Sequence, residues 1–273
     1  MAMLVYPLIQ TFIFSFSTIT LPSFSLEFSG INNFIRVFSR PEMPIVIRNT
    51  FVWTFFSVFL RLTLGLITAL VMNADLPGIK IFRILVLLPW TVPTIVSANT
   101  WRWIFQGDFG LLNGMFRMWG LPTFPWLGNA DTVLGAILVA ATWAGYPFVM
   151  MMLLSAMQNI PREHFEAALV DGANAFQRFW HIVIPGIKPM LLIVLALETI
   201  NAINAFDMVF AMTGGGPANA SEIIGLLIHR LGFGLFDFAG ASAVSVVLIL
   251  MALVLCFLYI LLQKAISSGG RKV

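Results

Sequence analysis

Apolar runs long enough to cross a lipid bilayer recur along this chain of 273 residues. A transmembrane helix needs about 20 mainly apolar residues, and none of these runs shows the repeating polar face of a surface helix. The pattern predicts an all-α integral membrane protein with about six transmembrane helices, a single transmembrane domain over 1–273 with its core at about 45–265. The runs lie near residues 2–20, 48–73, 82–105, 132–157, 187–211 and 239–263.

The composition excludes several classes of soluble protein. Hydrophobic residues make up 59% of the chain and charged residues 10%, whereas a soluble domain carries about 25% charged residues. The 15 Lys and Arg against 12 Asp and Glu give too small an excess of positive charge for a face that binds nucleic acid. The one cysteine, Cys256, excludes an intrachain disulfide. No G-x-x-x-x-G-K-[ST] phosphate loop occurs, so we expect no nucleotide to bind this chain through one.

The first apolar run is expected to stay in the mature protein. It lacks a basic region at its start and a small-residue cleavage site before Leu21, which are the features of a secretory signal peptide. Because the run begins abruptly, we expect a retained helix that is truncated at its start.

The lysines predict which loops face the cytoplasm. Basic residues in short loops favour the cytoplasmic side, and with the N-terminus inside every lysine falls on that side, whereas arginines occur on both. We therefore expect a multi-pass protein of the cell (inner) membrane with both termini cytoplasmic. The outer segments are then 21–46, 106–131 and 212–238, and we expect short interfacial helices in them, such as one over 31–38.

The cytoplasmic connection 159–189 is the most informative segment. Pro161 suits a first helical turn, and Gly172 suits a left-handed stop after a helix over 162–170. A second helix is expected from Asn174 to His181, broken at Pro185. The loop therefore predicts a helix-turn-helix with a surface of small residues, Ala167, Ala168 and Ala173, against which another protein packs closely.

One fixed pattern in this loop resembles a known family. Glu166-Ala167-Ala168 is followed after three residues by Gly172, and after nine more by Ile182, one residue and Ile184-Pro185. This arrangement resembles the EAA loop of the permease subunits of ATP-binding-cassette (ABC) importers, whose pattern is E-A-A-x3-G-x9-I-x-L-P. Only Ile184 departs from it, in place of the usual Leu.

Four further segments resemble the carbohydrate-uptake branch, similar to the membrane subunits of the maltose importer. They are an outer segment, a kinked third span, the entry to the cytoplasmic loop and a glycine-rich turn after the fifth span. In this sequence they read Gly30-Ile31-Asn32-Asn33-Phe34, Leu88-Pro89-Trp90 with Pro93, Gln158-Asn159-Ile160-Pro161 and Thr213-Gly214-Gly215-Gly216-Pro217.

The resemblance implies the type I importer permease fold and a set of partners. These are a second, non-identical permease subunit, two cytosolic ATPase subunits that bind ATP and Mg, an extracytoplasmic solute-binding protein, and a sugar or oligosaccharide. The chain itself is expected to bind no cofactor and not to be an enzyme. The residues expected to couple it to the ATPase are Glu166, Ala167, Ala168, Asp171, Gly172, Phe176 and Pro185.

Polar side chains in the fifth run are candidates for the substrate pathway. Glu198, Asn201, Asn204 and Asp207 follow one another at intervals of three, which gives a stripe that spirals round a helix. Amides suit the hydroxyls of sugars because each offers donors and an acceptor without a charge. The alternative is that Glu198, Asn201 and Asn204 form hydrogen bonds within the helix bundle.

An aromatic and glycine cluster in the fourth run is the second pathway candidate. Trp143, Gly145 and Tyr146 precede Pro147, which predicts a bent helix with aromatic faces to cover the C–H face of a pyranose; alternatively the aromatics only fill the bundle. Arg61, near the middle of its run, is expected to pair with an acid or a carbonyl at the subunit interface, with no partner assigned. Metal binding by His164 and His181 is disfavoured because they lie on different helices.

Two other functions remain as alternatives at this point. A stand-alone secondary transporter or channel would use Glu198 and Asp207 to carry protons or Na⁺, but such proteins commonly have matched halves, and none is visible. An ABC permease for another solute, such as glycerol phosphate or a polyamine, is the other. A phosphate cargo needs Arg or Lys deep in the pathway, where only Arg61 is available.

Overall fold

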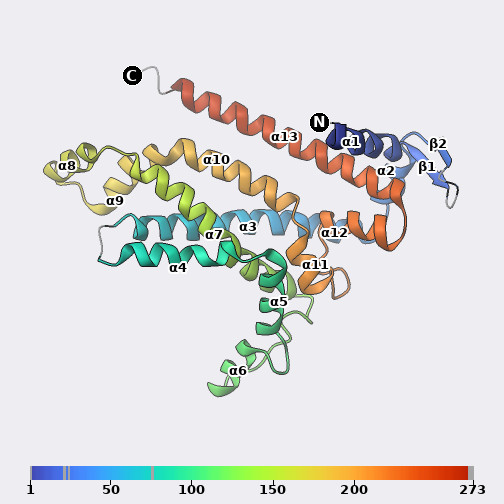
Figure 1. Ribbon diagram of the computed structural model, residues 1–273, viewed down its shortest axis with the longest axis horizontal. Helices are drawn as coiled ribbons and strands as arrows, with labels where there is room; N and C mark the ends of the chain where they lie inside the picture. Colours follow the sequence, from blue (N-terminus) through green and yellow to red (C-terminus); the bar gives the residue numbers. More distant parts are fainter. Residues whose placement is uncertain (1, 21–22, 24, 75–76, 270–273) are drawn as a thin grey trace.

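The computed structural model describes residues 2–20, 23, 25–74 and 77–269, most of them in helices (Figure 1). The elements are α1 Ala2–Ser15, β1 Ser17–Thr20, β2 Ser25–Phe28, α2 Asn32–Phe38, α3 Met43–Met72, α4 Ile79–Thr91, α5 Thr94–Ile104, α6 Leu111–Met118, α7 Val133–Gln158, α8 Arg162–Val170, α9 Ala175–Arg178, the π-helix η1 Phe179–Val183, α10 Ile184–Ile203, α11 Asp207–Thr213, α12 Ile224–His229, the π-helix η2 Arg230–Gly234 and α13 Phe238–Gly269.

Among the described residues, four helical segments are long and apolar enough to cross a membrane: Met43–Met72, Val133–Gln158, Ala175–Ile203 and Phe238–Lys264. A fifth span forms if α4 and α5 are counted as one, although they are bent by 93° relative to each other. Pro93 lacks an N–H and restricts the residue before it to an extended conformation, which Val92 adopts. The helical membrane class is confirmed, and the run 82–105 is a broken span.

The first apolar run forms less helix than the sequence predicts. α1 has 14 residues, after which β1 pairs with β2 in an antiparallel hairpin that the all-α prediction did not include. Asn33 Nδ2 donates hydrogen bonds to the carbonyl oxygens of Ser15, at 3.1 Å, and Ser17, at 2.9 Å. These bonds hold the chain in its turn away from the helix. In the part of the chain that the structure describes, the first run is thus a short helix and not a full span, and it lies beside α13 (Figure 1).

The centre of the fold is the packing of α3 against α7, with α4 and α10 beside them (Figure 1). Gly65 on α3 lies so close to α7 that an added Cβ atom would be 2.6 Å from Cγ1 of Val149. Gly145 on α7 lies equally close to α3, where an added Cβ would be 2.5 Å from Nε of Arg61. Small residues at such crossings let helices in a membrane approach closely. The two glycines therefore fix the register of α3 on α7.

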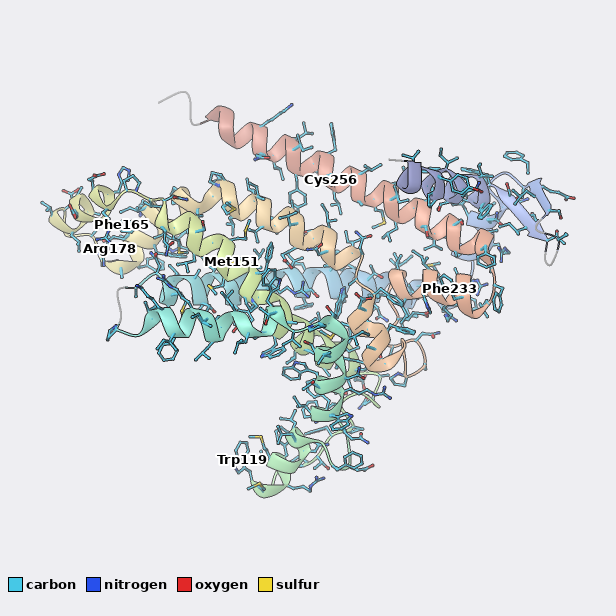
Figure 2. All side chains as sticks on the ribbon, in the orientation of Figure 1. Trp119, Met151, Phe165, Arg178, Phe233 and Cys256 are labelled. Atoms are coloured by element: carbon cyan, nitrogen blue, oxygen red, sulfur yellow. The ribbon has the colours of Figure 1, made fainter. Side chains whose placement is uncertain are left out.

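α5 and α6 form an arm that projects from the bundle, with Trp119 near its tip (Figure 2). The buried amide of Asn113 holds the arm together: its Nδ2 donates to the carbonyl oxygens of Gly107 and Phe124, both at 2.8 Å. Its Oδ1 accepts from Nε1 of Trp126 at 2.9 Å. Phe105, Leu112 and Trp126 of the arm belong to the same apolar cluster as Trp53 and Ile137 of the bundle, so the arm is anchored to the bundle core. α2 over 32–38 and the bend at Pro93 agree with the sequence-based expectations.

A chain of alternating charges joins the ends of α2, α3 and α13. In order of contact it consists of Arg36, Asp237, Arg40, Glu42, Arg230 and Glu222. Burial opposes the charge of Asp237, but hydrogen bonds from Arg36 and from the Gly240 N–H outweigh it and leave the pKa of Asp237 below its ordinary value. The Arg36–Asp237 pair therefore stabilises the fold at neutral pH and is lost as the pH falls through that lowered pKa. For Glu222, burial dominates and raises the pKa despite Arg230.

Candidate functional site

The connection 159–189 is the helix-turn-helix that the sequence predicts. α8 ends at Asp171, and Gly172 follows in the left-handed region, with φ of +75°. Asn174 caps α9 in a reciprocal arrangement with Gln177: each side chain accepts a hydrogen bond from the other residue's backbone N–H, at 2.9 and 2.8 Å. Both ends of the turn are therefore fixed by local hydrogen bonds.

The predicted break at Pro185 is wrong. α9 continues through η1 into α10, which makes Ala175–Ile203 one segment of 29 residues. In η1 the N–H of Ile184 bonds the carbonyl of Phe179, five residues earlier, so the turn is wider than in an α-helix. Pro185 then sits in the first turn of α10, where a missing N–H is tolerated. The second helix of the loop and the fifth apolar run therefore form one continuous rod.

The predicted coupling residues divide between two sides of the loop. Glu166, Gly172 and Phe176 are exposed, and Phe176 has 71% of its surface free. The other four line a cavity of about 530 Å³ between α8 and the start of α10, together with His164 and His181. These four coupling residues are Ala167, Ala168, Asp171 and Pro185.

Sequence reasoning missed three exposed apolar side chains on the same loop. Val170 is 88% exposed, and Leu169 and Trp180 are also largely free. The rings of Phe176 and Trp180, spaced as neighbours on one helix face, lie edge to face with centroids 6.2 Å apart. The spacing of four residues between Phe176 and Trp180 was the signal in the sequence that could have revealed this pair. Within the described residues, no group of three His, Cys, Asp or Glu side chains is placed to hold a metal ion.

Arg61 pairs with an acid, as the sequence predicts, and that acid belongs to its own chain. Its Nη1 lies 2.9 Å from Oε2 of Glu198, and the two side chains are 17% and 4% exposed. The pair ties α3 to α10. A second tie runs beside it, because Nε1 of Trp53 donates to the carbonyl of Ala202 at 3.1 Å. Only a glycine at 145 leaves room for the guanidinium group.

This ion pair lies in a cavity of about 350 Å³ between α3, α4, α7, α10 and α11. Of the predicted pathway residues, the cavity contains Glu198, Asn201 and Gly145. Asp207 also reaches it. The sequence did not single out the aromatic walls of the cavity, although Trp90 lies in the Leu-Pro-Trp motif. These walls are Trp53, Trp90, Phe148 and Phe206, with the Trp90 and Phe148 rings stacked at 5.8 Å.

Three predicted pathway residues do not line the cavity. The prediction of a single polar stripe along one helix is wrong because α10 ends at Ile203. The side chain of Asn204 instead bonds its own helix, with Nδ2 donating to the carbonyl of Ile200 at 2.9 Å. Asp207 belongs to the next helix, α11. Trp143 packs edge to face on Trp101, with centroids 5.8 Å apart. Tyr146 also lies outside the cavity wall.

Comparison with known proteins shows which family has this sequence and architecture. Residues 61–272 match the family model described as "Binding-protein-dependent transport system inner membrane component". The chain is 38% identical over 233 residues to the trehalose/maltose transport system permease protein MalF of Thermococcus litoralis, covering 85% of this chain and 79% of that protein. It is 30% identical over 258 residues to the sulfoquinovosyl glycerol transport system permease protein SmoG of Agrobacterium fabrum, covering 94% and 84%.

A solved structure has the same fold. A chain of a bacterial ABC transporter involved in the import of the acidic polysaccharide alginate superposes with a TM-score of 0.86 at 20% identity, covering 96% of this chain and 90% of that one. The helical bundle, the broken span and the helix-turn-helix over 162–178 thus occur together in a sequence that the family model covers for most of its length. The chain therefore belongs to the family of inner membrane components of binding-protein-dependent transport systems, and is the permease subunit of an ABC importer.

Proposed function

We propose that this permease forms half of the translocation pathway for a neutral sugar or oligosaccharide delivered by an extracytoplasmic binding protein. The observation that carries the proposal is the composition of the 350 Å³ cavity: aromatic walls, the amide of Asn201, and an arginine already neutralised by Glu198. Aromatic faces cover the apolar side of a pyranose ring, and a few polar groups fix its hydroxyls. A second, non-identical permease completes the pathway.

The charge of the cavity disfavours an anionic cargo. A phosphate needs an arginine whose positive charge is not already balanced, but Arg61 is paired through Nη1 with the carboxylate of Glu198. Asp207 adds a further carboxylate. The two relatives described above are named for a trehalose/maltose and for a sulfoquinovosyl glycerol transport system, and sulfoquinovosyl glycerol carries a sulfonate. Within that range, the arrangement of Arg61, Glu198 and Asp207 supports a neutral sugar over glycerol phosphate.

ATP hydrolysis resides in partner subunits, as it does in this family. We assign their contact to the exposed face of the cytoplasmic loop, around Glu166, Gly172 and Phe176. Two ATPase subunits would close on ATP and Mg, draw the two loops of the permease pair together, and open the spans outward. The 29-residue rod from Ala175 to Ile203 would carry that movement to the cavity. Family membership leaves the stand-alone transporter without support.

The coupling role predicts a specific effect of strain at Gly172. In Gly172→Val, a side chain is forced into the left-handed region at a cost of about 1–2 kcal/mol, which is about a tenfold change in the population of the native turn. We expect reconstituted importer to lose most of its sugar uptake and to copurify with less ATPase, with membrane insertion unchanged. Gly78→Val is the matched control, because Gly78 has φ of +79° and, like Gly172, open space around it. Equal losses in both variants would remove the loop from the coupling mechanism.

The orientation of the chain is tested by labelling. In a Cys256→Ser background, an impermeant maleimide applied to whole cells is expected to modify Asp108→Cys on the projecting arm and to spare Arg162→Cys at the start of α8. Both residues are exposed, so burial does not protect either thiol. Labelling should reach Arg162→Cys only after the cells are permeabilised. The reverse pattern would place the coupling loop outside and overturn the proposal.

Asn201 and Asn204 form a matched pair for testing the cargo. Asn201 lines the cavity, whereas Asn204 is exposed but bonds its own helix. We expect Asn201→Leu to lower sugar uptake by about tenfold, because a sugar hydroxyl left unpaired costs about 1–3 kcal/mol. Asn204→Leu should change uptake little. ATP hydrolysis stimulated by the loaded binding protein should partly survive in both. Normal uptake by Asn201→Leu would exclude its amide from the substrate site.

A further inference from the structure

A second cavity of about 880 Å³ lies between the projecting arm and α11. Its walls come from the end of α5, the turn after it, the 125–128 segment of the arm, and the chain from Phe210 to Pro217. It shares α11 with the inner cavity: the first residues of this helix line the inner cavity, and the last residues line the outer one. α11 therefore separates two cavities that lie in sequence along it.

The walls of the outer cavity are fixed by hydrogen bonds. On the arm, Asn113 bonds the carbonyls of Gly107 and Phe124. On the opposite side, the hydroxyls of Thr213 and Ser221 lie 2.8 Å apart, and Ser221 Oγ donates to the carbonyl of Gly216 at 2.7 Å. A ligand entering this cavity would meet walls that are already formed, which lowers the entropy cost of binding.

Polar side chains on these walls retain unused hydrogen-bonding groups. Arg102 and Asp108 are exposed, and neither makes a side-chain hydrogen bond or an ion pair with any other described residue. Gln106 uses its Oε1 to accept from the N–H of Gly107, at 2.7 Å. Its amide nitrogen makes no bond within the described residues. A guanidinium, a carboxylate and an amide offer a neutral polyol both donors and acceptors.

Aromatic rings line the outer cavity and continue to the inner one. Trp103 and Phe109 are each 80% exposed at the outer cavity. Phe210, on the same wall, stacks on Phe206, with ring centroids 4.9 Å apart and planes at 20°. Phe206 in turn lines the inner cavity. The pair therefore continues the aromatic lining from one cavity to the other, and the apolar C–H face of a pyranose packs on the ring surfaces that the stack leaves uncovered.

We infer that the outer cavity is a second carbohydrate subsite, which takes neutral hexopyranose units before they reach the inner cavity along Phe210 and Phe206. Arg102, Asp108 and Gln106 would bind the hydroxyls, and Trp103 and Phe109 would cover the rings. The inference rests on the proposed function, since it assumes that the inner cavity conducts a sugar. It adds to that function a second subsite, so that one oligosaccharide could occupy both cavities at once.

Sugar protection of a cysteine tests the subsite without transport. The importer is reconstituted in proteoliposomes, without ATP or binding protein, with Cys256→Ser and a reporter thiol at Gly128→Cys in the cavity wall. Maltotetraose at two-thirds occupancy should slow maleimide labelling of this thiol about threefold. Gly114→Cys is the matched control reporter, because it lies on the same arm in open space and off the cavity. Adding Asp108→Asn or Arg102→Gln should abolish the protection.

A parallel transport assay separates a failure of the subsite from a failure of the proposed function. Uptake of maltotetraose with ATP and the binding protein is measured in parallel. Uptake without protection at Gly128→Cys overturns the subsite and leaves the proposed function intact. Protection without uptake supports the subsite and counts against the proposed function. A Gly128 thiol that stays unlabelled with and without sugar means that a partner subunit fills the cavity, which also overturns the inference.

Discussion

Replacing Glu198 with alanine is expected to reduce both the yield of the importer and its sugar uptake more than any other single change in the cavity. Glu198 is buried, and its carboxylate lies 2.9 Å from Arg61. Removing one member of a buried ion pair leaves the other charge without compensation, at a cost of about 3–5 kcal/mol. Thermal unfolding of the purified permease complex and uptake by proteoliposomes measure the two effects.

Two variants separate the charge of the pair from its packing. Replacing both partners, in Arg61→Met with Glu198→Met, should restore much of the thermal stability, because apolar pairs often replace buried ion pairs without loss. Glu198→Gln keeps the shape and one hydrogen bond and should fall between the wild type and Glu198→Ala. If the double variant is as unstable as Glu198→Ala, the ion pair is not the source of the loss.

Gly145→Ala is expected to have the second largest effect, although it adds only one methyl group. The new Cβ would lie 2.5 Å from Nε of Arg61, so the guanidinium group must move away from Glu198. Overpacking of this kind costs about 1–3 kcal/mol, and the displaced arginine would also narrow the cavity. We expect a lower unfolding temperature and a loss of uptake.

Gly135→Ala on the same helix is the control for Gly145→Ala. An added Cβ there meets no atom within 4 Å, so the alanine should be neutral or should stabilise α7 by about 0.5–1 kcal/mol. In the Arg61→Met, Glu198→Met background, the cost of Gly145→Ala should shrink, since the flexible methionine can yield. An unchanged cost in that background would show that the methyl group clashes with something other than Arg61.

The sequence predicted correctly those elements that depend on residues close together in the chain. The helix-turn-helix followed from Pro161, Gly172 and Asn174, because caps and left-handed stops act within a few residues. The bend at Pro93 followed from the resemblance of Leu88-Pro89-Trp90 with Pro93 to a kinked third span. The resemblance in the EAA loop gave the family, which the match over 61–272 confirms.

Contacts between segments far apart in the chain could not be predicted from the sequence. Nothing local in the chain links Arg61 to Glu198, which lie 137 positions apart. The polar stripe failed because a fixed helical period was carried past Ile203, where α10 ends. The break at Pro185 failed for the opposite reason: proline was taken to end a helix, whereas the π-turn before it places its ring in a first turn.

The unbroken segment Ala175–Ile203 has a consequence for the design of chimeric importers. Phe176, which we place in the contact with the ATPase, and the amide of Asn201 lie on one continuous helical segment, so their angular positions round its axis are linked. Inserting a single residue between them would rotate Asn201 by about 100° round the axis while leaving the EAA motif intact. A loop transplanted from a relative must therefore preserve the residue count between the two ends, or the graft will bind its ATPase with the amide turned out of the cavity.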